Sequence, residues 1–306
     1  MRISAAVLAL LLCAACNGGS DKRGTTPRAI SDDALSAIEV SWPKALQAEW
    51  KRRLSTVDWM RRYLLAAVLA SRAAAAHGLP NSESLSVLER VTDLHWRAHF
   101  GSLSAEGQTF QASLQVEVTH QKTKVQTLAQ PRSLPGALTA QARAILTAKT
   151  HLEHRSGGWA GRLQRTRKVW FNHFARVRPD QKVDVWVVAF PTRKHQVVLG
   201  GDYRFLISAD GSRVLHARSL HSGLTVADMT AQSERQPALM NHIHRAREGE
   251  LPTATDLLKL QSSPSLRGLV VIGPRYTLYL ERHPQRELWS TRLLDSARYR
   301  SLLRGR

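Results

Sequence analysis

Cysteine is almost absent from this sequence, and both of its cysteines, Cys13 and Cys16, lie near the N-terminus of the 306 residues. A disulfide framework, a cysteine-based metal site and a cysteine nucleophile are therefore excluded for the remainder of the chain. The folded part has to be held together by packing. With 43% hydrophobic residues, the chain has enough apolar material for one large domain or two small ones.

The sequence also lacks the common short motifs of serine hydrolases and nucleotide-binding proteins. It contains no G-x-S-x-G. No phosphate-binding loop is present either, because Gly200-Gly201 lies inside a strand-like run, where it predicts a β-bulge. Both of these enzyme classes are therefore disfavoured.

Long apolar runs are scarce, and the one at the N-terminus, residues 3–12, is too short to span a bilayer as a helix. It follows the basic Arg2 and precedes small residues, a pattern typical of a secretory signal peptide over residues 1–15. The small residues directly before Cys16 resemble the bacterial lipobox, in which the cysteine is lipidated and becomes the mature N-terminus. An ordinary signal peptide that is cleaved nearby is the alternative.

The expected lipid anchor implies an exported protein that faces the periplasm from a bacterial membrane. Asn17 after the cysteine favours the outer membrane, by analogy with lipoprotein sorting in enterobacteria. Residues 16–32 are rich in Gly, Ser, Thr, Asp and Lys without an apolar period, so we expect them to form a flexible tether. The folded part is expected to begin near Asp33.

Acidic residues are few relative to basic ones: 24 Asp and Glu stand against 44 Lys and Arg, which gives a formal net charge of +20 at pH 7. Such an excess attracts anionic surfaces. For an envelope lipoprotein these are phospholipid head groups, lipopolysaccharide and acidic wall polymers, whereas an exported protein rarely meets nucleic acid. The alternative is that the charge reflects composition alone, with the arginines simply solvated.

Periodicity predicts a mainly helical region over residues 33–156. Apolar residues recur at helical spacings over 42–77 and again over 82–99, and an Ala-rich run over 137–152 predicts a third helix. Only residues 110–120 alternate in strand fashion within this region.

The period changes after residue 156, and an antiparallel α+β domain is expected over residues 157–306. Four strand-like runs, expected to form a meander, occupy 169–177, 183–190, 196–208 and 213–220. The second run is apolar on both faces and is therefore expected to be central. Helices are predicted over 225–234 and 287–303. The expected fold class is α+β, with a helical N-terminal part packed on a mostly antiparallel sheet and a strand-helix-strand C-terminal region.

The most informative stretch joins a strand over 238–244 to a helix over 253–261. His242 and His244 occupy alternate strand residues and therefore share a face. Asp256 lies in the first turn of the helix, where the helix dipole favours a carboxylate. Two imidazoles and one carboxylate that converge can bind a metal ion, so these three side chains are candidate metal ligands.

This order, His242-Ile-His244, a loop, and Thr253-Ala-Thr-Asp256 at a helix start, resembles the zinc site of the JAMM (JAB/MPN) metalloprotease family. The family pattern is His-x-His-Pro followed by Ser-x-x-Asp. The resemblance implies that His242, His244 and Asp256 hold zinc. It also gives Thr253 the role of the serine that helps to stabilise the tetrahedral intermediate. Arg245 replaces the family's proline, a threonine replaces its serine, and the loop is one residue longer than usual.

The resemblance further implies an upstream glutamate as general base. Glu153, which precedes the expected sheet, is the best-placed candidate, and Glu89 is the reserve. A structural interpretation of the same stretch stays open: Thr253 caps the helix by bonding the backbone of Asp256, and the histidines are polar residues at a strand end.

The sequence therefore leaves two functions open, and with them the question of whether the protein is an enzyme. One is a cell-envelope lipoprotein with a non-catalytic binding or structural role and a basic surface for anionic envelope components. The other is a zinc-dependent amide or isopeptide hydrolase.

Overall fold

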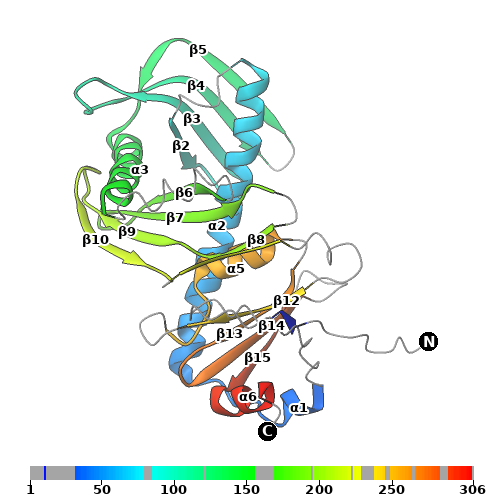
Figure 1. Ribbon diagram of the computed structural model, residues 1–306. Helices are drawn as coiled ribbons and strands as arrows, with labels where there is room; N and C mark the ends of the chain where they lie inside the picture. Colours follow the sequence, from blue (N-terminus) through cyan, green and yellow to red (C-terminus); the bar gives the residue numbers. More distant parts are fainter. Residues whose placement is uncertain are drawn as a thin grey trace. The chain divides into compact units, whose positions relative to one another are not determined.

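The computed structural model describes eleven stretches of the chain (Figure 1): residues 10–11, 32–78, 85–119, 122–155, 169–193, 196–221, 223–228, 238–244, 249–263, 266–282 and 289–304. Cys16 and nearly all of the expected tether lie outside these residues. Among the described helices, none is long and apolar enough to cross a membrane.

The chain forms two compact units that are discontinuous in sequence. Unit 1 comprises Met1–Val57, Ala189–Gly201 and Leu220–Arg306, and unit 2 comprises Asp58–Val188 and Asp202–Ser219. The chain therefore passes between the units four times. The sequence suggested instead a single boundary near residue 156.

Unit 1 is built on a sheet with the strand order β1-β12-β13-β14-β15. The strands are β1 (Leu10–Leu11), β12 (Ala238–Ile243), β13 (Leu266–Ile272), β14 (Tyr276–Arg282) and β15 (Trp289–Asp295). β12 and β13 run parallel because α5 (Ala254–Ser262) connects them as a crossover, whereas β13, β14 and β15 pair antiparallel. The predicted strand-helix-strand region is thus confirmed.

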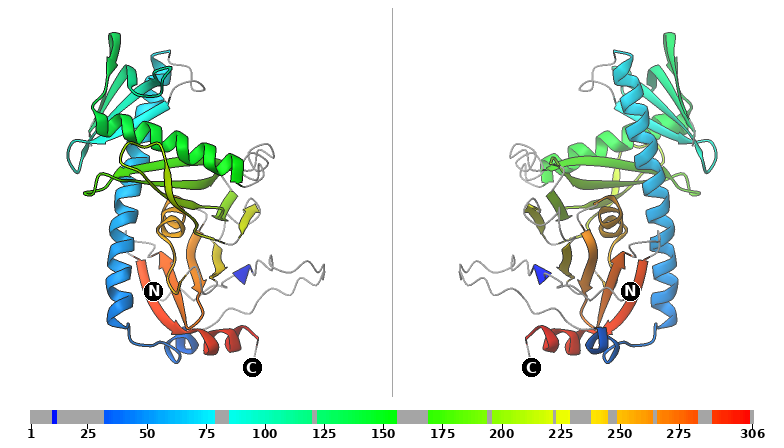
Figure 2. Two further views of the ribbon diagram at one scale, coloured as in Figure 1. Left: turned by 90° about the vertical axis from the view of Figure 1, so that its left-hand side faces the viewer. Right: turned by 90° about the vertical axis from the view of Figure 1, so that its right-hand side faces the viewer.

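Both faces of this sheet are buried, because side chains of β13 alternate between two cores. Leu269 and Val271 lie in a core with residues of α5 and of the first part of α2 (Lys44–Ala76). Val270 and Ile272 lie in a second core with residues of α1 (Asp32–Ser36) and α6 (Ser296–Leu303). Figure 2 shows α1 and α6 together at one end of the sheet.

A two-stranded ribbon completes unit 1. In it, β8 (Gln196–Gly200) pairs antiparallel with β11 (Leu224–Asp228). Val197 and Leu199 of β8 belong to the same core as Leu257 of α5. The ribbon is therefore fixed beside the helix that follows β12.

Unit 2 contains two four-stranded sheets, with the orders β10-β9-β7-β6 and β2-β3-β4-β5. Their strands are β2 (Leu85–Arg90), β3 (His95–Leu103), β4 (Phe110–Thr119), β5 (Thr123–Ser133), β6 (Val169–Val177), β7 (Val183–Pro191), β9 (Tyr203–Ile207) and β10 (Val214–Ser219). α3 (Gly136–Arg155) contributes Ala144 to the core of the first sheet and Ala142 to that of the second. β7 lies between β9 and β6, as predicted for a strand that is apolar on both faces.

The fold class is α+β, as the sequence predicted, but the helix predicted over residues 82–99 is wrong. Leu85–Arg90 forms β2, and the chain from His95 onward forms β3. Val87 and Leu88 are neighbours in sequence and both are buried, and they pair with His99 and Ala98 across the two strands. Pairing within the sheet overrides the helical spacing of the leucines.

Two further predicted helices are also corrected. Residues 225–228 lie in β11, where they pair with β8, and residues 229–234 lie outside the described stretches. Within 287–303, β15 runs to Asp295, and α6 begins only at Ser296 with Asp295 as its N-cap. In both places, residues whose local sequence pattern favoured a helix pair as a strand instead.

The run over residues 196–208 is two strands rather than one. Gly200 and Gly201 both have positive φ, a conformation that glycine adopts without strain, and they end β8. β9 then starts at Tyr203 and pairs with β7 and β10 in a sheet of unit 2. The predicted meander therefore holds for β6, β7, β9 and β10, but not for β8.

Candidate metal centre

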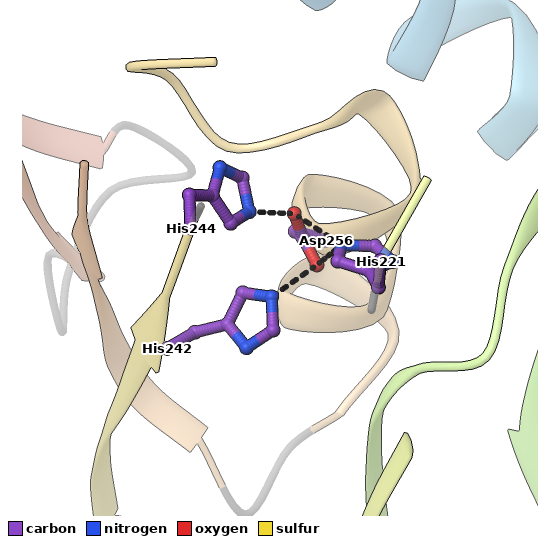
Figure 3. A group of neighbouring side chains, drawn as sticks. All are labelled: His221, His242, His244 and Asp256. Carbon is purple, nitrogen blue, oxygen red and sulfur yellow. Dashed lines mark hydrogen bonds and ion pairs between the residues drawn. The ribbon is translucent and has the colours of Figure 1, made fainter. Parts of the chain in front are cut away.

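Three segments of unit 1 meet at three histidines and one aspartate: His221, His242, His244 and Asp256 (Figure 3). We call these four residues the histidine–aspartate group. One candidate ligand atom from each residue lies within 4.8 Å of the other three. The sequence predicted that three of the four would converge, and they do, whereas His221 was not predicted.

β12 directs two imidazoles toward α5. His242 lies in the strand, and His244 follows the last strand residue, with its backbone N–H bonded to the carbonyl of Ile272 at 2.9 Å. Ile243 between them points away and is 63% exposed. Figure 3 shows both rings directed to the carboxylate of Asp256. The alternation of side chains along a strand thus sets this half of the group.

Asp256 is held in place by the start of α5. Thr253 is the N-cap, and its hydroxyl accepts the backbone N–H of Asp256 at 3.2 Å. The backbone N–H and the hydroxyl of Thr253 both donate to Asp256 Oδ2, each at 2.8 Å. The predicted cap is therefore present, and it is compatible with a ligand role because it occupies only one carboxylate oxygen.

The other carboxylate oxygen, Asp256 Oδ1, faces the imidazoles. It lies 3.0 Å from His221 Nε2 and 3.9 Å from His242 Nε2, and His244 Nε2 lies 3.4 Å from Oδ2. One carboxylate is therefore shared among three histidine side chains.

The histidine–aspartate group is closed to solvent, yet several of its polar atoms have no hydrogen-bond partner. Only the side chain of His242 is measurably open, at 16% exposed. His242 Nε2, His244 Nε2 and Asp256 Oδ1 make no hydrogen bond with the described residues. A buried polar atom without a partner costs about 1–3 kcal/mol. A cation held by these atoms would satisfy them together.

The protonation states of His242 and Asp256 suit a metal ion. Burial lowers the pKa of His242 to about 4, and the neighbouring imidazoles and Lys259 act in the same direction against the attraction of Asp256. Burial alone would raise the pKa of Asp256, but the charge and hydrogen bond of His221, together with the other two histidines, hold that pKa well below its usual range. Neutral imidazole and ionised carboxylate are the forms that bind metals.

The β8–β11 ribbon brings His221 to the group. His221 lies just before β11, and the N–H of Gly201 after β8 bonds the carbonyl of Gly223 at 3.0 Å. A Cβ on Gly200 would lie 2.1 Å from that same carbonyl oxygen, so this approach requires glycine. Lys259 Nζ of α5 donates to the carbonyl of Gly200 at 2.9 Å and fixes the end of β8 against the helix.

Neither predicted base belongs to the histidine–aspartate group. Glu153 lies on α3 in unit 2 with an exposed side chain, whereas the group lies in unit 1. Glu89 also lies in unit 2, where it pairs with Arg97 at 3.0 Å. Among the described residues, Asp256 is the only carboxylate of the group.

Comparisons with protein-family models, with curated protein sequences and with solved structures found no match to this chain. What the group can do is therefore argued from its donor atoms. Three imidazole nitrogens and one carboxylate oxygen can hold a divalent transition-metal ion.

Proposed function

We propose that the protein is a zinc-binding protein that holds the ion through His221, His242, His244 and Asp256. The observation that carries this proposal is the convergence of four largely buried side chains, among which His242 Nε2, His244 Nε2 and Asp256 Oδ1 make no hydrogen bond with the described residues. Zinc favours four ligands of this kind, and a site closed by four protein ligands is the usual arrangement of a structural zinc.

The test is the metal content of the purified full-length protein. Native mass spectrometry and elemental analysis should find one zinc per chain in the wild type and less than about a tenth of that in His244→Ala, because each ligand contributes strongly to affinity. His216→Ala, which removes an exposed histidine of β10, is the matched control and should retain the metal. Wild-type protein without stoichiometric metal after zinc reconstitution would end the proposal.

We propose further that the protein is a lipoprotein of the bacterial cell envelope, anchored through Cys16 and facing the periplasm, with the outer membrane as its site. Support comes from the apolar run over residues 3–12 and the small residues before the cysteine. Expressed in a Gram-negative host, the wild type should label with palmitate and partition into detergent. Cys16→Ser should lose the label, and an unchanged label would contradict the anchor.

The role within the envelope is then binding or structural, with anionic lipid, lipopolysaccharide or wall polymer as partners of the basic surface and no role for nucleic acid. The net charge of +20 supports this. Binding of the protein to anionic vesicles should weaken with salt, since exposed charges are screened over about 10 Å at 0.1 M. Vesicle binding that does not change between 0.05 and 0.5 M salt would leave the charge as composition only.

A second candidate is a zinc-dependent amide or isopeptide hydrolase. The convergence of His242, His244 and Asp256 favours it, because the JAMM resemblance requires these three ligands to meet. When bound, a catalytic zinc supplies Lewis-acid chemistry that activates water and polarises a carbonyl. In this chain Thr253 would contribute its hydroxyl, whereas neither Glu153 nor Glu89 belongs to the group, so the base that moves the proton is not among the group's described residues.

The two candidates differ in the role of His221. A four-ligand structural zinc needs it, whereas a three-ligand catalytic zinc does not. His221→Ala should lose more zinc affinity than the roughly 10–100-fold that loss of an outer-shell partner costs, if the site is structural. Zinc retained in this variant, together with hydrolysis of a crosslinked wall peptide that His244→Ala abolishes, would favour the hydrolase.

A further inference from the structure

Unit 2 contains a cavity of about 220 Å³ that has no part in the metal centre. Its walls come from residues of α2, β2, α3 and β6 that lie in unit 2; Figure 1 labels these elements. Along α2, Tyr63, Ala67 and Ser71 follow one another at a spacing of four residues, so one face of the helix forms one wall.

One polar atom of the cavity wall lacks a partner. Asn172 of β6 lines the cavity, and its Nδ2 is buried without a hydrogen bond to any described residue. Leaving a buried amide donor unpaired is unfavourable. A ligand that offers a hydrogen-bond acceptor to this donor therefore gains binding free energy from the new hydrogen bond. The amide of Asn172 is therefore the polar contact point of the cavity.

The remainder of the wall is uncharged. His173 also lines the cavity, and burial, with a smaller contribution from Lys149, lowers its pKa to about 4, so the imidazole is neutral near pH 7. The described lining residues include no carboxylate, lysine or arginine. A charged ligand would lose its hydration here without gaining a counter-charge.

Aliphatic and aromatic side chains form the apolar part of the wall. The rings of Tyr63 and Phe174 both line the cavity, with centroids 5.4 Å apart at a tilted angle. Such rings offer flat apolar area and edge contacts to another ring. A dry apolar cavity of about 150 Å³ holds benzene, so 220 Å³ has room for a molecule of about ten non-hydrogen atoms.

We propose that this cavity binds a neutral small molecule of fused-ring size that presents one hydrogen-bond acceptor to Asn172 Nδ2. The site is separate from the histidine–aspartate group, and the proposal holds whether or not the protein binds zinc.

Three probes that differ in one feature test the proposal on the full-length protein, with binding followed by isothermal titration calorimetry and NMR. 1-Indanone carries the ring and a carbonyl acceptor, indane lacks the acceptor, and indane-1-carboxylate is charged. Saturable binding of 1-indanone is expected, with indane bound about tenfold more weakly because the amide stays unpaired. The carboxylate should show no saturable binding.

Variants locate the bound probe. Ala67→Leu fills the cavity and should abolish binding of 1-indanone, while Ala75→Leu, on an exposed position of the same helix, is the matched control and should leave it unchanged. Asn172→Ala should remove the difference between 1-indanone and indane, and it tests the site even if Ala67→Leu fails to fold. The proposal is overturned if 1-indanone does not saturate, or if Asn172→Ala preserves the tenfold preference.

Discussion

Each unit contains a cluster in which two histidines on one face of a strand lie close to one or more carboxylates of neighbouring elements, and the two clusters differ in their other members. In unit 2, Arg97 of β3 bonds Glu117 at 2.6 Å and Glu89 at 3.0 Å, and His95 also bonds Glu117. These side chains are between about a fifth and two fifths exposed. In unit 1 the histidine–aspartate group is buried and contains no arginine.

The comparison teaches that two histidines on one face of a strand do not by themselves indicate a metal site. His95 and His99 lie with Arg97 on one side of β3, and the neighbouring carboxylates of β2 and β4 are neutralised by the guanidinium. Among the described residues no guanidinium pairs with Asp256, and buried ligand atoms of the histidine–aspartate group make no hydrogen bond. The neighbours across the strand, rather than the spacing, separate a surface ion-pair network from a candidate metal centre.

The largest expected difference comes from removing the carboxylate of each cluster. Asp256→Ala deletes a fully buried acceptor that serves the cap and the histidines, and should lower the free energy of unfolding by about 3–5 kcal/mol. Glu117→Ala removes a partly exposed ion-pair partner and should cost about 1 kcal/mol at most. Urea unfolding with chelator present measures both, and equal losses would break the comparison.

The second expected effect is the response to zinc. At a free concentration of 100 times the dissociation constant, zinc should stabilise the wild type by about 2.7 kcal/mol, because it binds the folded state. Thermal unfolding with and without zinc measures this shift, and a chelator should reverse it. His244→Ala should not respond, whereas His95→Ala in the unit 2 cluster should respond like the wild type.

The third prediction concerns the pH dependence of stability that His173 of unit 2 contributes. The folded pKa of His173 is about 4 and the unfolded value about 6.5, so the unfolded state binds more protons as the pH falls through this window. Stability is therefore full above pH 6.5 and is lost on acidification, by about 2 kcal/mol at pH 5 from this residue. His173→Gln should remove that part of the loss. Parallel pH profiles for the two proteins would contradict the prediction.

The smallest expected effect concerns the cap of α5. Thr253→Ala should cost about 1 kcal/mol in urea unfolding, the usual value for a lost N-cap, while Thr253→Ser should retain most of it. Both variants should still bind zinc, since Thr253 is not a ligand. Loss of zinc in Thr253→Ser would show that the threonine does more than orient the carboxylate.

Much of the metal centre could be predicted from sequence because three of its residues are close together in the chain. Strand alternation places His242 and His244 on one face, and the first helical turn holds Asp256 near the end of that strand. His221 could not be found this way. It lies 35 residues before Asp256 and reaches the group only through the pairing of β8 with β11, which no local pattern encodes.

The fold shows the same limit. α2 and α3 were predicted because long helical patterns with breaker residues at their ends carry their own signal. β2 and β15 were predicted as helices because their leucines recur at helical spacings, whereas the partner strands that capture them are set by tertiary pairing. The sequence predicted a bulge at Gly200-Gly201, where β8 in fact ends. Glycine is required at position 200 because its backbone lies against the carbonyl of Gly223, a tertiary contact that the local sequence pattern does not show.

The discontinuity of unit 1 has a consequence for the order of synthesis. The first segment of the chain finds its partners among the last: the backbone N–H of Val40 bonds the carbonyl of Leu293 at 2.8 Å, and Leu35 shares a core with Tyr299. Because a chain is synthesised from its N-terminus, these apolar residues cannot be buried against their partners until nearly the whole polypeptide has been made. The last candidate ligand, Asp256, is also made late. An ion held by the histidine–aspartate group would therefore find all four ligands only after most of the chain has been synthesised.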